Sequence, residues 1–196
     1  MKQQDTKHSR QLEFAACTNN LEAAHAIAAA HGGTVYWDPR DKFSHLPFRA
    51  LTTCVTDDLT QLQPAADIGL YLVCRRIIKP GQPEYVGLFP MVRHPELTHA
   101  QADAHWRDSH APLTFEHHAA MNHYSQLSVV QRLSGPEIDG FALCGFVSLE
   151  DLRERFYTRP DSAGIIAADI RRFADTKQSP RRLIATVKSF AEPAIV

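Results

Sequence analysis

Apolar residues in the first part of the chain alternate with polar ones in some runs and recur at helical spacing in others. Alternation over about four to eight residues is typical of a strand, and recurrence every three or four residues is typical of a helix. The pattern predicts helices at Asn19–His31, which is rich in alanine, and at Asp57–Ala66. Strands are predicted at Gln11–Cys17, Thr34–Trp37, Arg49–Thr56 and Asp67–Ile78.

The second part of the chain repeats this order with stronger signals. Pro112 must interrupt or bend the first of its helices, because proline lacks an N–H and clashes with the preceding turn. Between the two parts, the two prolines and the glycine of Lys79–Pro83 predict a linker. Strands are predicted at Tyr85–Val92, His123–Leu133, Gly140–Val147 and Arg181–Phe190, and helices at Thr98–Met121, Leu149–Tyr157 and Ile165–Ala174.

Two consecutive β-α-β-β-α-β orders predict an α+β fold of two tandem ferredoxin-like units. The N-terminal half would span residues 11–80 and the C-terminal half residues 85–190, after a disordered lead at residues 1–10. Packing two such sheets face to face buries both and encloses a cavity between sheet and helices. One chain would then build the barrel that a single-unit protein builds by dimerising.

Composition narrows the class of protein. A net charge of −1 and scattered arginine doublets, including Arg181-Arg182, argue against a nucleic-acid-binding face and favour solvated surface. No apolar run approaches the roughly 18 residues of a membrane span, and the polar start MKQQDTKHSR predicts a cytoplasmic protein. The four cysteines stand singly in apolar runs, which favours buried free thiols over disulfides or a zinc site.

One segment carries a family resemblance. Arg93–Leu113, RHPELTHAQADAHWRDSHAPL, is similar to the central motif of EthD-domain proteins, in which a helix carries Trp-Arg and then His-Ala-Pro. Tyr124 stands where the family has an aromatic residue at the start of the next strand. The runs Gly145–Leu152 and Ala168–Asp175 resemble later elements of the family, so the likeness covers roughly residues 85–190.

The resemblance implies a dimeric α+β barrel fold with a small-molecule cavity. The wider superfamily includes cofactor-free monooxygenases, polyketide cyclases, dehydratases, decarboxylases and lactone isomerases. Membership of a fold does not choose among these reactions. The candidate residues must be judged by their own chemistry.

His110 is the strongest catalytic candidate. It precedes Pro112, where the helix is interrupted and a local hydrogen bond can hold one imidazole tautomer. The second nitrogen could then face a cavity and transfer a proton near neutral pH. A histidine that only caps the helix end is the alternative interpretation.

Three further residues have a structural and a functional interpretation. Trp106 lies one turn before His110, and core packing is its default role, but it could also line an aromatic-substrate pocket. Arg107 could bind a substrate carboxylate or pair with Asp103 one turn earlier. Tyr124 could donate a hydrogen bond into the cavity as a second catalytic residue, or it could be a half-buried strand tyrosine.

A stripe of four residues continues from this site along the helix. His110, Thr114, His117 and His118 follow one another at helical spacing. Such spacing could hold a metal, but Pro112 disturbs the register, so we expect no metal. Thr114 and His117 are instead predicted to contact substrate.

The sequence contains no GxGxxG, GxxxxGK[ST] or GxSxG motif, so no cofactor is expected. The favoured hypothesis is a cofactor-independent enzyme that uses His-assisted acid/base chemistry on a small carbonyl-bearing or aromatic metabolite, as a dehydratase, decarboxylase, cyclase or isomerase. One alternative is an oxidoreductase, either a cofactor-free monooxygenase or an accessory to an ether-degrading oxygenase. The other is a non-catalytic ligand-binding protein. The expected partner is a small-molecule substrate, with neither nucleic acid nor membrane. A homodimer with a second copy of the chain is left open.

Overall fold

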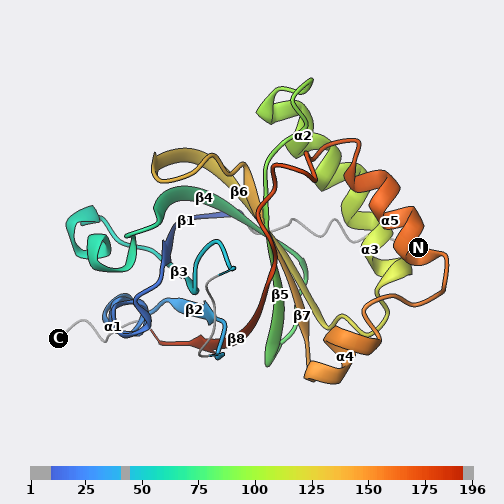
Figure 1. The fold of residues 1–196 in the computed structure, drawn as a ribbon. Helices are drawn as coiled ribbons and strands as arrows, with labels where there is room; N and C mark the ends of the chain where they lie inside the picture. The colour runs from blue at the N-terminus through green and yellow to red at the C-terminus, as the bar shows by residue number, and fades with distance from the viewer. Residues whose placement is uncertain (1–9, 41–44, 192–196) are drawn as a thin grey trace, which may run out of the picture.

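Strands dominate the architecture. The computed structural model describes residues 10–40 and 45–191, and within them eight strands pair antiparallel into one closed barrel in the order β1-β3-β2-β8-β5-β7-β6-β4 (Figure 1). β4 returns to β1 and closes the ring. The strands are β1 (Arg10–Thr18), β2 (Thr34–Trp37), β3 (Ala50–Cys54), β4 (Gly69–Lys79), β5 (Tyr85–Met91), β6 (His123–Ser134), β7 (Gly140–Phe146) and β8 (Leu183–Ser189).

This single closed barrel contradicts the predicted fold class of two tandem ferredoxin-like units packed face to face. The sheets of the two parts are joined through their edges, where β2 pairs with β8 and β4 pairs with β6. Unpaired edge strands expose N–H and C=O groups, and these pairings satisfy them. Sequence alternation reports which face of a strand is buried but not which strand lies beside it, so the closure was not visible in the pattern.

Helices cover the outside of the barrel in two groups. On one side lie α1 (Leu21–His31) and η1 (Leu59–Ala65), a 3-10 helix with Pro64 inside it where a short α-helix was predicted. On the other side, next to β5 and β7 in Figure 1, the remaining helices form a second layer. They are α2 (His99–His105), η2 (Trp106–His110), α3 (Ala111–His117), α4 (Leu149–Glu154) and α5 (Ser162–Ile170). None of the described helices is long and apolar enough to cross a membrane.

The barrel interior forms the main core. Alternate residues point inward, as the period of two of a strand requires. Tyr71 and Phe141 meet there edge to face, with ring centroids 5.5 Å apart. At one end the interior becomes polar, where Arg75 donates hydrogen bonds to Glu13 and Thr53. Side chains therefore fill the apolar part of the interior, and a cavity of about 180 Å³ lies at its polar end.

The two helical layers pack differently. α1 is capped at its start by the Asn20 side chain, which accepts from the Ala23 N–H, and it ends at Gly32 with φ 66°. Its buried residues, Ala24 and Ala28, are small and pack directly on the sheet. The helices on the other side present large aromatic and imidazole side chains to the sheet, and the cavity described below lies between them and the strands.

The predicted disordered lead at residues 1–10 falls outside the described residues except for Arg10, which is the first residue of β1.

Candidate functional site

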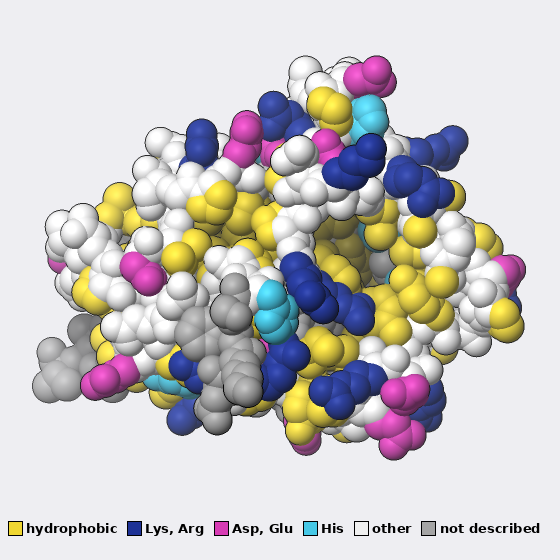
Figure 2. Space-filling view, viewed as in Figure 1, with side chains coloured by type: hydrophobic (Ala, Val, Ile, Leu, Met, Phe, Trp, Pro, Cys, Tyr) yellow, Lys and Arg dark blue, Asp and Glu magenta, His cyan; other side chains and the backbone are white. Residues whose placement is uncertain are grey.

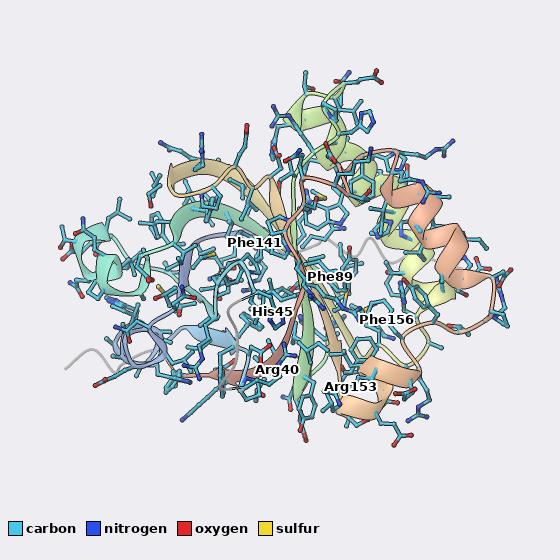
Figure 3. All side chains as sticks on the ribbon, in the orientation of Figure 1. Arg40, His45, Phe89, Phe141, Arg153 and Phe156 are labelled. Carbon is cyan, nitrogen blue, oxygen red and sulfur yellow. The ribbon has the colours of Figure 1, made fainter. Side chains whose placement is uncertain are left out.

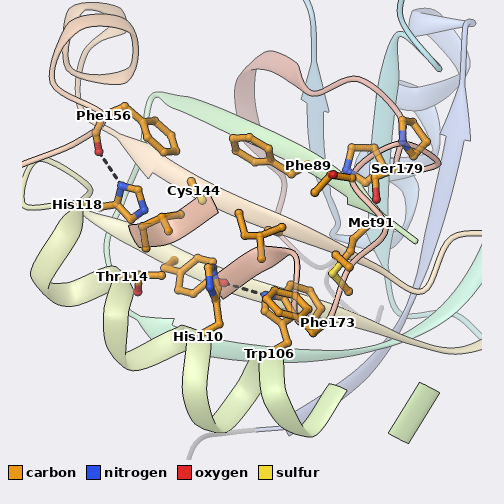
Figure 4. A pocket seen from close by; sticks show the side chains of 18 of the residues that line it. Phe89, Met91, Trp106, His110, Thr114, His118, Cys144, Phe156, Phe173 and Ser179 are labelled. Atoms are coloured by element: carbon orange, nitrogen blue, oxygen red, sulfur yellow. Dashed lines mark hydrogen bonds between the residues drawn. The ribbon is translucent and has the colours of Figure 1, made fainter. Parts of the chain in front are cut away.

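A cavity of about 270 Å³ lies between the outer face of the barrel and the second helical layer (Figure 4). Strands β5, β6 and β7 form its floor and the helices form its roof. Its opening is visible in Figure 2 as a hollow lined with hydrophobic side chains and bordered by basic ones. The residues that line it are mostly apolar or aromatic and include Phe89, Met91, Trp106, His110, Thr114, His118, Tyr124, Ala142, Cys144, Phe156, Tyr157, Ile166, Ile170 and Phe173.

The roof is built by one nearly continuous helix with an unusual middle. α2, η2 and α3 follow without a break, and η2 is a π-helical segment closed by a hydrogen bond from the Ala111 N–H to the Trp106 carbonyl. Such segments widen one helical turn and are frequent at functional sites. Pro112 follows just after this segment, at the start of α3, and lacks the N–H that a regular helix would use there. The interruption expected at Pro112 therefore takes the form of this wider turn.

The π-helical turn aligns side chains at intervals of four. Trp106, His110, Thr114 and His118 all line the cavity. In a regular α-helix, residues four apart drift around the axis, because a turn holds about 3.6 residues. The wider turn between Trp106 and His110 offsets part of this drift. Four residues spaced four apart, from Trp106 to His118, thus face the floor of the cavity.

His110 is held by a carboxylate from another helix. Its Nδ1 lies 2.8 Å from Oδ2 of Asp169 in α5, and the other oxygen of Asp169 lies 2.9 Å from Nε2 of His105. Burial opposes ionisation of Asp169, but hydrogen bonds from the two histidines outweigh it and lower the pKa of the carboxyl. An ionised carboxylate only accepts, so His110 donates through Nδ1.

The second nitrogen of His110 is consequently the basic one. Burial lowers the pKa of His110, and the opposing effect of Asp169 reduces this shift without cancelling it. The neutral imidazole therefore carries its lone pair on Nε2, and the His110 ring lines the cavity. A neutral, oriented imidazole in an apolar cavity has the properties of a general base.

Tyr124 presents a hydroxyl group to the same cavity. Its oxygen accepts from Trp106 Nε1 at 3.0 Å and from Gln126 Nε2 at 3.1 Å (the Trp106 bond is dashed in Figure 4). Burial raises the pKa of the phenol, so it keeps its proton at neutral pH. With two hydrogen bonds already accepted, Tyr124 can act only as a donor toward a ligand.

The donors to Tyr124 are themselves fixed. The side-chain oxygen of Gln126 accepts from Arg76 Nε at 3.1 Å, which sets the amide so that its nitrogen faces Tyr124. Arg76 in turn makes two 2.7 Å bonds to the carboxylate of Asp103 and lies over the Trp106 ring. This buried network holds the phenol in one position.

A second imidazole lines the cavity at His118. Its Nδ1 donates to the backbone oxygen of Phe156 at 2.6 Å, and burial lowers its pKa. It is therefore neutral, with the lone pair on Nε2. Cys144 also lines the cavity, but burial raises the pKa of its thiol to about 12, which leaves it protonated.

The sequence-predicted site residues divide into two groups. Trp106, His110, Thr114 and Tyr124 meet at the cavity. Arg107 and His117 lie outside its lining: Arg107 pairs with Asp108, and His117 is buried against the hydroxyl of Ser162 at 3.0 Å. Within the described residues, no group of three or more histidines, cysteines or carboxylates is placed to hold a metal ion.

Sequence reasoning missed several residues of the site. In the sequence, Asp169 belongs to the run Ala168–Asp175 that resembles the EthD family, although an acidic residue in the apolar stretch Ile165–Ala174 indicates a buried partner. Helical spacing predicts a substrate contact for His117, whereas the neighbouring His118 lines the cavity. The rings of Phe89, Phe156 and Phe173 come from three distant segments, and only the fold brings them together.

Comparison with known proteins supports the fold but no family. No protein-family model matches the chain, and neither does any curated protein. A solved structure described as an anthrone oxidase-like protein superposes with a TM-score of 0.55, covering 98% of both chains at 11% sequence identity. At this identity the likeness shows a shared fold alone.

Proposed function

We propose that this protein is an enzyme that removes a proton next to a carbonyl group, or from a phenol, of a small aromatic substrate. The observation that carries the proposal is the pairing of His110, oriented by Asp169, with the donor-only hydroxyl of Tyr124 in one apolar cavity. A base and an oxyanion donor are the two groups that enolisation requires.

The step assigns each group one role. Nε2 of His110 takes the proton, and the electron pair of the broken C–H bond moves to form the enolate. The negative charge collects on the carbonyl oxygen, where the Tyr124 hydroxyl donates a hydrogen bond. The positive charge on His110 is stabilised by Asp169, which lies 2.8 Å away.

The apolar lining selects the substrate class. Aromatic rings from Trp106, Phe156 and Phe173 surround the cavity, and its volume of about 270 Å³ suits a compound of two or three fused rings. His110 is only 7% exposed in this apolar surrounding, which strengthens electrostatic interactions at its ring. We infer a carbonyl-bearing aromatic metabolite as substrate.

The enolate can continue by dehydration, cyclisation or isomerisation, and decarboxylation of a β-keto acid would form the same enolate by loss of CO₂. All four reactions need only acid/base groups. The resemblance of residues 85–190 to EthD-domain proteins agrees with this cofactor-independent chemistry. Under this hypothesis the chain itself supplies every group that handles the proton.

Oxidation is the second candidate, and the solved structure described as anthrone oxidase-like favours it. The deprotonated carbon would transfer electrons to dioxygen, so that a CH₂ group and O₂ yield C=O and water. The same base and the same hydrogen-bond donor serve both candidates. They differ only in whether oxygen is consumed.

The test uses two probes and one substitution. In D₂O, the protein should exchange the α-protons of 2-tetralone, followed by NMR, and His110→Asn should slow this exchange by roughly 10²-fold or more. His94→Asn, at a histidine outside the cavity lining, is the control and should exchange normally. Exchange that survives in His110→Asn would refute the assigned base. Oxygen uptake with anthrone then separates the oxidase from the other reactions.

A further inference from the structure

Arg182 lies at the mouth of the cavity and has no acidic partner within residues 10–40 and 45–191. Its guanidinium carbon lies 5.6 Å from the ring centroid of Phe89 and 5.8 Å from that of Phe156, and both rings line the cavity. The two rings pack against each other, with centroids 6.0 Å apart, and are labelled in Figure 3. No carboxylate of the described residues lies within ion-pair distance of Arg182. The two rings therefore place a free cation at the entrance.

The charge of Arg182 affects the pKa values of two residues that line the cavity. It opposes the rise that burial causes in the pKa of the Cys144 thiol, and it does the same for Tyr157. Both residues line the cavity. Figure 2 shows basic side chains beside the hollow.

Two other arginines, Arg76 and Arg93, differ from Arg182 because each has an acidic partner. Arg76 is paired with Asp103 and Arg93 with Asp139. A guanidinium that is stacked on aromatic rings keeps its in-plane N–H groups available, and these match the two oxygens of a carboxylate. Arg182 is exposed to solvent, and its position over two cavity rings lets it contact a ligand at the opening.

The base and this cation lie on opposite sides of the cavity. In Figure 4 the rings of Phe89 and Phe156 form one side, and His110 and Trp106 form the other. A ligand that spans the cavity would meet a cation at one end and the base at the other.

We propose that the cavity takes an aromatic carboxylate, whose anionic group pairs with Arg182 while its ring system lies between the aromatic walls. The position of the reacting carbon at His110 rests on the proposed function. The recognition of the carboxylate does not, because binding can be measured without turnover.

The experiment compares two ligands of nearly equal shape and different charge, 2-naphthoate and its neutral amide, 2-naphthamide. Titration calorimetry on the full chain should show naphthoate binding about tenfold more tightly, the scale of one charge-assisted hydrogen-bonded pair. Arg182→Gln should abolish this preference and leave the affinity for naphthamide unchanged. Arg182→Lys should keep part of it, since it retains the charge but not the planar fork.

The matched control is Arg181→Gln, which removes the same charge from the adjacent exposed residue and should retain the preference. His110→Asn should also retain it, so loss of catalysis and loss of carboxylate recognition are separable. Equal affinity for the two ligands in the wild-type protein, or no binding of either, would overturn the proposal. An equal effect of the Arg181 and Arg182 substitutions would overturn the assignment to Arg182.

Discussion

Asp169 and His110 lie 2.8 Å apart across two helices that are far apart in the sequence. The carboxylate comes from α5 and the imidazole from the π-helical segment of the roof helix. Because the second oxygen of Asp169 contacts His105, neither the carboxylate nor the His110 ring is free to rotate. The tautomer of His110 is thereby set by tertiary structure, and its basic nitrogen is determined before any ligand binds.

Asp169→Asn tests this orientation. Asn retains the shape but loses the charge, so the His110 tautomer is no longer fixed and its positive form is no longer stabilised. We expect turnover to fall by about 10²-fold, the lower end of what general-base catalysis contributes. Since Asp169 raises the pKa of His110 against the effect of burial, the acid limb of the kcat/KM profile should move to lower pH.

The control for this substitution is Asp175→Asn, whose carboxylate accepts from the backbone of Lys177 and Gln178 and does not contact His110. It should leave the pH profile in place. A fall in turnover for Asp169→Asn without a shift of the acid limb would indicate a structural role only.

Tyr124→Phe tests the hydrogen-bond donor. Removal of the hydroxyl should lower kcat by roughly 10²–10³-fold, as loss of one oxyanion donor does, with little change in KM. It also leaves the N–H groups of Trp106 and Gln126 without their acceptor, at a cost of about 1–3 kcal/mol in unfolding free energy. Both effects are measured on the same sample, by steady-state kinetics and urea unfolding.

Tyr71→Phe is the matched control, because its hydroxyl donates to the Pro136 carbonyl from inside the barrel, away from the cavity. It should reduce stability by a similar amount and leave kcat unchanged. If the two variants lose kcat equally, the role of Tyr124 is packing alone.

Stability should fall as the solution becomes acidic. His110 and His118 are buried and His123 is partly buried, and desolvation lowers the pKa of each below the ordinary 6.5. Below about pH 6.5 the unfolded chain binds protons that the folded chain excludes, so the free energy of unfolding decreases until the folded-state pKa values are reached. Above that pH both states are neutral at these residues and the contribution is fully present.

Urea midpoints measured between pH 7.5 and pH 5 should follow this decline. A variant with His118→Gln should show a shallower slope, because one of the three groups no longer titrates. A midpoint that is constant over this range would contradict the burial of neutral imidazoles.

Gly140→Ala tests how closely Trp106 packs on the floor of the cavity. A Cβ at this position would lie 2.6 Å from Cζ3 of Trp106 and 3.0 Å from the Leu127 carbonyl oxygen. The indole must move, so we expect a loss of about 1–3 kcal/mol in unfolding free energy and a shift in tryptophan fluorescence. The same movement disturbs the bond from Trp106 to Tyr124.

Gly164→Ala offers the comparison, since nothing lies within 4 Å of its added methyl group and it stands inside α5. It should be neutral or stabilising by up to about 1 kcal/mol, because alanine favours helix. A stable Gly140→Ala variant with unchanged fluorescence would show that the strands can shift to accommodate the methyl group without moving Trp106.

Sequence patterns predicted the elements better than their assembly. The strand at Thr34–Trp37 and the helix start at Thr98 are confirmed, the latter by a capping box with Gln101. Local signals sufficed there because alternation and capping act between near neighbours. The closed barrel depends on pairing between β2 and β8, which no local signal encodes. The Asp169–His110 pair could not be predicted for the same reason, because it joins residues 59 positions apart in the sequence.

The position of β8 in the ring has a consequence for how the protein is made. β8 pairs with β2 on one side and β5 on the other, and it follows all other described strands in the chain. During synthesis, the edges of β2 and β5 that pair with β8 therefore remain unpaired until β8 has left the ribosome. Non-local closure of this kind folds slowly and exposes sheet edges to other chains meanwhile. We expect nascent chains to depend on chaperones until β8 is in place, and the yield of folded protein to be limited by that final step.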